Sequence, residues 1–180
     1  RHEAPHGCPY DVRAGVAAVR SLLAKGRDGS HDELRVGPGD AFMTEPKVVL
    51  VAPENPANVG FAARVCANFG VQDWVQVGGC NLRNSEAEKT GAPARPQLES
   101  LQRVDALADA LGDTTHVVGF TARAGQHRQP QSAHQLSKWR QAWGADAKVA
   151  FVFGRESRGL ETAEVSLCSY LIFIPTFGLS

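Results

Sequence analysis

The feature that most constrains the fold is an alternation of short, almost wholly apolar runs with helical patterns between residues 47 and 174. Apolar runs without polar alternation are typical of strands buried on both faces, and strands that alternate with helices predict a parallel sheet. We therefore expect an α/β fold in which helices cover both faces of a mostly parallel sheet. The expected strands are residues 48–52, 74–77, 116–120, 149–153 and 170–174. The expected helices are residues 59–69, 101–111, 132–143 and 161–167.

The chain divides into two parts near residue 45. Residues 1–44 contain one short helical pattern followed by a stretch rich in Gly, Asp and Ser, so we expect an N-terminal extension. Residues 45–180 contain the alternating elements and are long enough for one domain with its own core. Because the chain stops at Ser180 directly after an apolar strand, we expect this domain to be cut short at its C-terminal end.

Composition limits the classes of partner. The 19 Lys and Arg balance the 19 Asp and Glu, so any contact with RNA has to come from a local patch. The four cysteines lie far apart and form no CxxC pair, which argues against a zinc ribbon or a dense disulfide framework. We expect a reducing compartment, with the cytoplasm as the default, although an organelle would equally allow free thiols. No apolar run approaches the roughly 20 residues of a membrane span, so we expect no membrane partner.

Metal and thiol chemistry are not expected. The six histidines show no HExxH motif and no carboxylate spacing suited to a metal, so we predict no metal. Cys66 and Cys168 lie in apolar helical patterns. A cysteine in such a pattern is typically a small buried hydrophobe, and we do not expect either thiol to be a nucleophile.

Unusual residues collect where the expected strands end. Ligands of parallel sheets bind at the carboxyl ends of the strands, so the loops there are candidates for a site. These loops are residues 53–58, 121–131, 154–159 and the segment from Pro175 onward.

Asn58, Gly60 and Arg64 form the first candidate group. A Pro/Asn-rich turn that opens a helix is a ready anion site, and an arginine one to two turns into the helix can reach it. Gly60 and Arg64 share a helix face, and a glycine inside a helix indicates close approach by a backbone or a ligand. In the alternative interpretation, Asn58 is only a helix cap and Arg64 a solvated or carboxylate-paired side chain. Spacing alone does not separate the two.

Two further loops carry charge. Residues 154–160 place three charged side chains in a turn between a strand and a helix, but contain neither a GxGxxG fingerprint nor a phosphate loop. Taken alone, that turn is better explained by salt bridges. The loop that contains Arg123, His127 and Arg128 could bind phosphate locally, and a solvated polar loop explains it equally well.

Three segments together resemble the signature motifs of the SPOUT superfamily, in order and in spacing. They are Asn58-x-Gly60-x-x-x-Arg64, the run FGRESRGL at residues 153–160, and Ile174-Pro175-Thr176. Within that superfamily the chain is similar to the TrmH-like RNA ribose 2′-O-methyltransferases. The FGRE form of the second motif is most similar to the TrmJ branch, which modifies tRNA in the anticodon loop. The resemblance covers residues 47–180 and leaves the N-terminal extension uncovered.

The resemblance implies a domain with a trefoil knot, which general folding rules treat as an exception. It implies S-adenosylmethionine as cofactor, bound by Phe120, Thr121, Ala122, Gly154, Ile174 and Pro175. Glycine at 154 would let backbone amides approach the adenosine. The family's third motif, which completes the knot and the cofactor pocket, is missing here or only begins at Ser180.

The resemblance also implies roles in catalysis. Arg64 and Asn58 would be the catalytic residues, and Arg64 would hold the target phosphate and polarise the ribose hydroxyl. Gly60 and Glu156 would support them, with Glu156 orienting neighbouring arginines. The RNA, expected to be tRNA, would contact Arg64, Arg123, Arg128 and Arg155. SPOUT enzymes are usually homodimers in which one subunit's arginine completes the other's pocket.

Other classes remain open from the sequence. A noncatalytic RNA-binding or scaffold protein on the same fold would fit if the third motif is truly absent. An rRNA 2′-O-methyltransferase would share the motifs. A nucleotide-binding α/β enzyme of another kind fits the alternation of elements but not the motifs.

Overall fold

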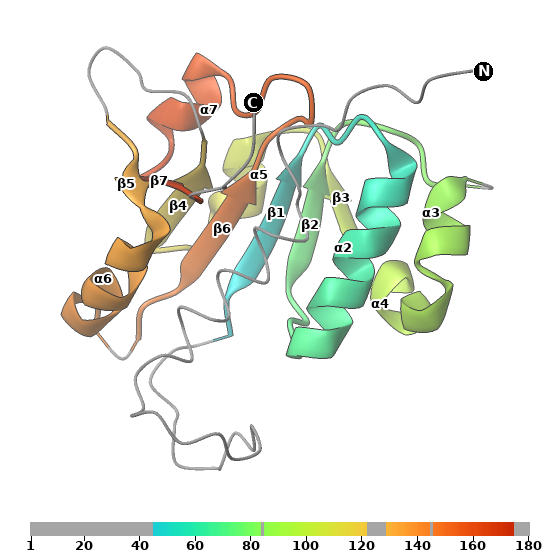
Figure 1. Ribbon diagram of the computed structural model, residues 1–180, viewed down its shortest axis with the longest axis horizontal. Coiled ribbons are helices and arrows are strands. Elements are labelled where there is room, and N and C mark those ends of the chain that lie inside the picture. The colour runs from blue at the N-terminus through green and yellow to red at the C-terminus, as the bar shows by residue number, and fades with distance from the viewer. Residues whose placement is uncertain (1–44, 84, 122–128, 145, 175–180) are drawn as a thin grey trace, which may run out of the picture.

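The computed structural model describes residues 45–83, 85–121, 129–144 and 146–174. The N-terminal extension expected over residues 1–44 lies outside this range. The described part is built around one parallel sheet of seven strands in the order β3-β2-β1-β6-β4-β7-β5 (Figure 1). The strands are β1 (Lys47–Val51), β2 (Trp74–Val77), β3 (Gln102–Val104), β4 (His116–Phe120), β5 (Gln131–Ser132), β6 (Val149–Phe153) and β7 (Tyr170–Phe173). Every strand pair is parallel, which confirms the predicted fold class.

Helices cover both faces of the sheet. One face packs against α2 (Pro56–Phe69), α4 (Arg95–Glu99) and α6 (Leu136–Ala142). The opposite face packs against α5 (Leu107–Leu111) and α7 (Thr162–Ser166). The central strand β6 is buried along its whole length, as a strand covered on both faces must be.

The helix α2 begins earlier than the sequence indicates. Its N-cap is Asn55, whose side chain accepts a hydrogen bond from the N–H of Ala57, and Pro56 occupies the first turn. Proline is favoured there because its missing N–H would have no partner inside the helix. Gly70 ends the helix in the left-handed conformation at φ 68°. The prediction of Asn58 as a cap is therefore wrong, and Asn58 lies inside the first turn.

Two predicted stretches have a different secondary structure. The segment after β2 contains the short helices α3 (Glu86–Thr90) and α4 and a 3-10 turn, η1 (Ala92–Ala94), where the sequence predicted neither a helix nor a strand. The predicted helix over residues 101–111 is the edge strand β3 followed by the five-residue α5. A second 3-10 turn, η2 (Ala133–Gln135), precedes α6. Within the described ranges, no helix is long and apolar enough to cross a membrane.

The neighbouring strands β1 and β6 connect in opposite directions. After β1 the chain passes into α2 on one face and on to β2, whereas after β6 it passes into α7 on the other face and on to β7 (Figure 1). Loops that diverge in this way leave a crevice at the carboxyl ends of the two strands, where α/β proteins usually bind ligands. The loop after β1 leads directly into the first motif, at the start of α2, and the second motif lies at the end of β6 and in the loop after it.

Candidate active site at the carboxyl edge of the sheet

The ends of β4, β6 and β7 bring four of the predicted cofactor residues to one edge. Phe120 lies in register between Phe153 of β6 and Ile172 of β7. The rings of Phe120 and Phe153 are stacked at 4.2 Å. Thr121 follows Phe120 and is buried, and its N–H donates to the carbonyl of Ile172 at 3.0 Å. Gly154 and Ile174 follow β6 and β7, so the structure gathers the described members of this group. Ala122 and Pro175 lie outside the described residues.

The turn after β6 folds back on itself as a small hairpin. Arg155 and Gly159 exchange backbone hydrogen bonds of 3.1 and 2.8 Å, and Gly159 has a φ of 68°. A Cβ on Gly154 would lie 2.2 Å from the carbonyl carbon of Gly159 and 2.3 Å from the nitrogen of Leu160. Glycine at 154 is therefore required by the chain's own returning backbone. The expectation that it also lets backbone amides approach adenosine stays a prediction.

Glu156 is the centre of this turn's contacts with α2. Its side chain is buried, with 7% exposed, and its carboxylate accepts hydrogen bonds from the loop after β1. The donors are the N–H of Glu54 at 2.7 Å, the N–H of Asn55 at 3.3 Å and the Nδ2 of Asn58 at 2.9 Å. Glu156 was expected to orient neighbouring arginines. The structure gives it the backbone and amide donors at the start of α2, and its role toward the arginines stays a prediction.

The predicted anion site at the start of α2 is thus occupied by a carboxylate of the chain itself. An anion at a helix N-terminus is stabilised by the unpaired N–H groups and by the helix dipole. Glu156 takes that position, and the crevice between β1 and β6 is closed by its hydrogen bonds. A ligand at this edge therefore has to bind beside the crevice, at the ends of β4, β6 and β7.

Gly60 and Arg64 lie on the face of α2 that meets α3. A Cβ on Gly60 would lie 2.1 Å from Oγ1 of Thr90 and 2.5 Å from the carbonyl oxygen of Ala87. The predicted close approach is confirmed, and the approaching groups are the backbone of α3 and the side chain of Thr90. Arg64 itself is exposed, and within the described ranges no ion pair involves it.

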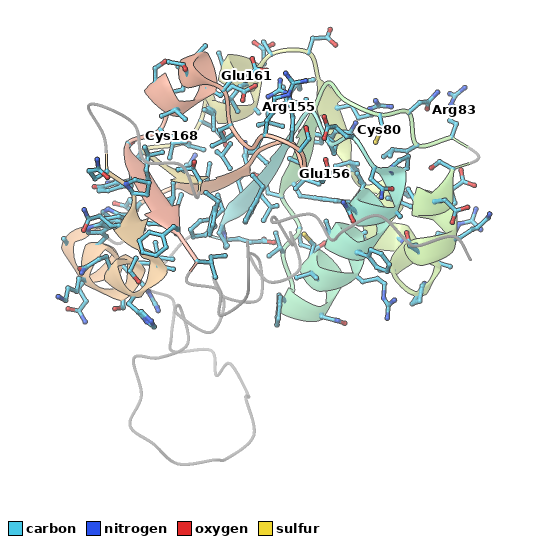
Figure 2. The ribbon with its side chains drawn as sticks, turned by 45° about the horizontal axis from the view of Figure 1, so that its top comes forward. Cys80, Arg83, Arg155, Glu156, Glu161 and Cys168 are labelled. Atoms are coloured by element: carbon cyan, nitrogen blue, oxygen red, sulfur yellow. The ribbon has the colours of Figure 1, made fainter. Side chains whose placement is uncertain are left out.

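Arg155 is held by α7. Its Nη1 donates to both carboxylate oxygens of Glu164 at 3.0 Å and lies 3.6 Å from Glu161. Figure 2 shows Arg155 and Glu161 together on the α7 side of the turn, whereas Glu156 lies toward α2. The side chain of Arg155 is 18% exposed and its guanidinium is paired with Glu164, and its predicted contact with RNA stays a prediction. Of the other predicted RNA contacts, Arg123 and Arg128 lie outside the described residues.

The cysteines behave as the sequence predicted. Cys66 and Cys168 are buried, and burial raises the pKa of the Cys66 thiol to about 12. Cys80 is half-buried after β2, where burial and then the negative charge of Glu156 raise its pKa. Its carbonyl accepts a hydrogen bond from Arg103 at 3.2 Å. Among the described residues, no three His, Cys, Asp or Glu side chains are grouped as a metal site would require.

Sequence reasoning missed the role of Glu54 and Ser157. The carboxylate of Glu54 accepts hydrogen bonds from the N–H of Ser157 at 3.0 Å and from its Oγ at 2.8 Å. The available signal was that Glu54 lies shortly before the first motif and Ser157 lies inside the second, in loops that follow strands of one parallel sheet. That signal places two loops at one edge but does not pair their side chains.

The chain is similar to known methyltransferases over the described domain. The family model of the SpoU rRNA Methylase family matches residues 45–179. A tRNA (cytidine-2'-O-)-methyltransferase TrmJ from Methanocaldococcus jannaschii is 33% identical over 133 residues, which cover 72% of this chain and 57% of that protein. The crystal structure of TrmJ from Z. mobilis ZM4 is 29% identical with a TM-score of 0.65, over 73% of this chain and 59% of that chain.

A more distant structure shares the fold. The SpoU methyltransferase AviRb from Streptomyces viridochromogenes, in complex with the cofactor AdoMet, is 18% identical with a TM-score of 0.55. The match covers 74% of this chain and 52% of that chain. The chain spans about half the length of the curated relatives it matches. Since the family model covers nearly all of the domain built around the parallel sheet, the chain belongs to the SpoU rRNA Methylase family.

Proposed function

We propose that this chain carries the catalytic domain of an S-adenosylmethionine-dependent methyltransferase that acts on a ribose 2′-hydroxyl of tRNA, with an anticodon-loop position as the expected target. The observation that carries the proposal is the convergence of the motifs at one edge of the sheet. Asn58 and Glu156 are joined by a hydrogen bond of 2.9 Å, and Gly154 opens the same turn beside the end of β4. The relatives at 31 to 33% identity are named tRNA 2′-O-methyltransferases.

The described edge fits the proposed cofactor. Phe120 and Phe153 are buried and stacked on each other where β4 and β6 end, and Ile174 is partly buried beside the same core. The residues at this edge are therefore apolar, which suits an adenine ring, and the backbone at Thr121 and Gly154 carries polar groups. S-adenosylmethionine supplies a methyl group on a sulfonium when bound. The task of the chain's own residues is to align the ribose oxygen with that methyl and to assist the loss of the hydroxyl proton.

Asn58 is oriented for this task. Because its Nδ2 donates to Glu156, the opposite end of the amide, Oδ1, is turned away from that carboxylate. Among the described residues, no hydrogen bond to Oδ1 is formed. We assign this oxygen the role of accepting a hydrogen bond from the ribose hydroxyl, which fixes the direction of attack.

We assign Arg64 the role of binding a phosphate group of the substrate RNA. A guanidinium stays charged at neutral pH, so binding a phosphate and polarising the hydroxyl suit it better than acting as a base. Arg64 lies eight residues after Pro56, which is about 12 Å along α2 from the carboxyl edge of the sheet. This separation favours a homodimer in which Arg64 of one subunit completes the partner's pocket.

Methyl transfer from labelled S-adenosylmethionine tests the proposal. The full-length protein, its Arg64→Ala variant and the control Arg95→Ala are compared on unmodified tRNA and on rRNA. Arg95 is an exposed arginine paired with Glu99 in α4, so the control removes an equal charge away from the motifs. We expect transfer by the wild type and the control and a loss of at least a hundredfold in Arg64→Ala. Equal transfer by all three would refute the role of Arg64.

The RNA class is decided by the same assay. The family description favours rRNA as a second candidate, whereas the relatives named above favour tRNA. Label on tRNA alone supports the proposal, and label on rRNA alone supports the second candidate. Absence of transfer to either RNA, together with absence of S-adenosylmethionine binding by calorimetry, would favour a noncatalytic RNA-binding role.

Mixed dimers test the shared pocket. Co-expression gives mixed dimers in which one subunit carries Arg64→Ala and the other carries Ile174→Arg. If Arg64 acts across the interface, the pocket with the natural Ile174 also receives the natural Arg64 from the partner subunit. If Arg64 acts within its own subunit, both pockets contain one substitution. We expect each variant alone to be inactive and the mixture to recover part of the activity. No recovery in verified mixed dimers would place Arg64 in the pocket of its own subunit.

A further inference from the structure

The loops after β1 and β6 hold each other through two glutamates. Glu156 accepts hydrogen bonds from the N–H groups of Glu54 and Asn55, and Glu54 accepts them from the N–H and the Oγ of Ser157. Each loop thus gives a carboxylate to the backbone of the other. We call these four residues, Glu54, Asn55, Glu156 and Ser157, the reciprocal clasp.

The two carboxylates of the clasp have different surroundings. Glu156 is buried and receives three donors, so its loss would leave several buried groups without partners. Glu54 is exposed, where water can replace either donor of Ser157. Hydrogen bonds of an exposed side chain contribute little to global stability, so a change at Glu54 can alter the local geometry without unfolding the domain.

The clasp joins the two sides of the proposed reaction. The loop that bears Glu54 leads into the first turn of α2, which carries Asn58. The turn that bears Ser157 is bounded by Gly154 and Gly159, beside the expected cofactor pocket. The position of Asn58 relative to that pocket therefore depends on how the two loops are held together.

The loop that bears Glu54 is also fixed from its other side. Ala52 adopts a φ of 45°, in the left-handed region, which is unfavourable for alanine because of its Cβ. Its N–H donates to the carbonyl of Val77 at 2.8 Å, and the carbonyl of Pro53 accepts from the N–H of Cys80 at 2.9 Å. A strained backbone conformation of this kind persists only where surrounding contacts hold it in place. Glu54 consequently projects from a loop that is anchored on the β2 side.

We propose that Glu54 is a positioning residue for methyl transfer, which acts through both hydrogen-bond donors of Ser157 to hold the cofactor-side turn against the start of α2. The proposal rests on the proposed function for its catalytic readout. It assigns to Glu54, which lies outside the three motifs, and to Ser157, which lies inside the second, a role that the motif assignments above do not give them.

Kinetics of the full-length protein test the role. Glu54→Gln, Ser157→Ala and the double variant are compared with the controls Glu99→Gln and Ser166→Ala, which change an exposed glutamate in α4 and an exposed serine in α7. We expect kcat to fall on the order of tenfold in Glu54→Gln, because small misplacements of reacting groups are costly. The midpoint of thermal unfolding of Glu54→Gln should equal that of Glu99→Gln. The double variant should lose no more than Glu54→Gln alone, because both act through one contact.

The pH dependence of kcat distinguishes a positioning role of Glu54 from a merely structural one. The hydrogen bonds from Ser157, and then the nearby charges of Arg158 and Arg155, hold the pKa of Glu54 below its ordinary value. The other carboxylate of the clasp is Glu156, which accepts a hydrogen bond from the N–H of Glu54. A lowered folded pKa means that the contact is present above the ordinary pKa and is lost as pH falls through the lowered one. The kinetic difference between wild type and Glu54→Gln should therefore shrink in acid.

Amide hydrogen exchange separates the two hypotheses. If the wild type transfers no methyl group, the proposed function fails, and exchange at the Ser157 amide still decides whether the clasp exists. We expect exchange at this amide to quicken by about tenfold in Glu54→Gln and to stay unchanged in Glu99→Gln. Unchanged exchange in Glu54→Gln, or unchanged kcat in an active enzyme, would overturn the positioning role.

Discussion

Asn58 and Glu156, 98 residues apart in the sequence, are joined by a hydrogen bond of 2.9 Å from Nδ2 to Oε1. This contact links the first and second motifs directly. It also closes the crevice between β1 and β6, where parallel sheets commonly bind ligands. The two motifs therefore support each other structurally, and the proposed cofactor pocket is displaced toward β4 and β7.

Replacing the amide by a second carboxylate should break this link. In Asn58→Asp the new carboxylate faces Glu156, and like charges in a buried site destabilise the folded state. We expect a loss of about 1 to 3 kcal/mol in the free energy of unfolding at pH 7, measured with urea. Because repulsion raises the folded pKa of the pair, the stability should be retained at low pH and lost as pH rises. A loss that is equal at pH 5 and pH 7 would argue against carboxylate repulsion.

A methyl group at position 154 should be poorly tolerated. The Cβ of Gly154→Ala would meet backbone atoms of Gly159 and Leu160, which cannot move aside as a side chain can. We expect a loss of about 2 kcal/mol or more in the free energy of unfolding. Gly144→Ala is the matched control, since its Cβ would have no atom within 4 Å. Equal urea midpoints for the two variants would contradict the described hairpin.

A methyl group at position 60 tests the packing of α2 on α3. Alanine stabilises a helix by about 1 kcal/mol relative to glycine. The Cβ of Gly60→Ala would, however, overlap Thr90 and Ala87. We expect a net loss of about 1 to 3 kcal/mol in the free energy of unfolding, measured in urea. Gly112→Ala, with its nearest atoms at 4.0 Å, should be close to neutral. A stabilised Gly60→Ala would show that α3 does not approach α2 as described.

Alkylation should distinguish the cysteines of the described domain. The raised pKa of about 12 keeps Cys66 a thiol at pH 8, and burial denies it access to the reagent. Cys80 is half-buried, so we expect iodoacetamide to modify it before Cys66 and Cys168. Peptide mass spectrometry of the folded protein measures the order, and unfolding in urea should abolish it. Early modification of Cys66 in the folded state would contradict the described core.

The strands could be predicted because strands buried on both faces consist almost wholly of apolar residues. The run 149–153 is apolar along its whole length, and the runs 74–77 and 116–120 each contain one polar residue, Gln76 and His116. The structure confirms all three strands with the same bounds. The edge strand β3 was missed because Gln102 and Arg103 are exposed, and because apolar residues before and after it happen to follow helical spacing. Short charged helices such as α3 give no apolar stripe to detect.

The site could be located from the sequence but not assembled. Parallel topology and the resemblance placed the loops after β1 and β6 at one edge. The contacts of Glu156 with the start of α2 and of Arg155 with α7 could not be predicted, because both residues lie among several charged neighbours and only the folded turn directs one toward α2 and the other toward α7. The cap was assigned to Asn58 instead of Asn55, since both asparagines precede apolar residues and only backbone geometry separates them.

The position of the transferred methyl group tests the central claim most directly. tRNA labelled by the full-length protein from methyl-labelled S-adenosylmethionine is hydrolysed completely with alkali. A methyl group on the 2′-oxygen blocks cleavage at the following phosphate, because that cleavage requires the free hydroxyl. We predict that the label is found in alkali-resistant dinucleotides. Label in mononucleotides would show a methylated base and would contradict the proposed ribose methylation.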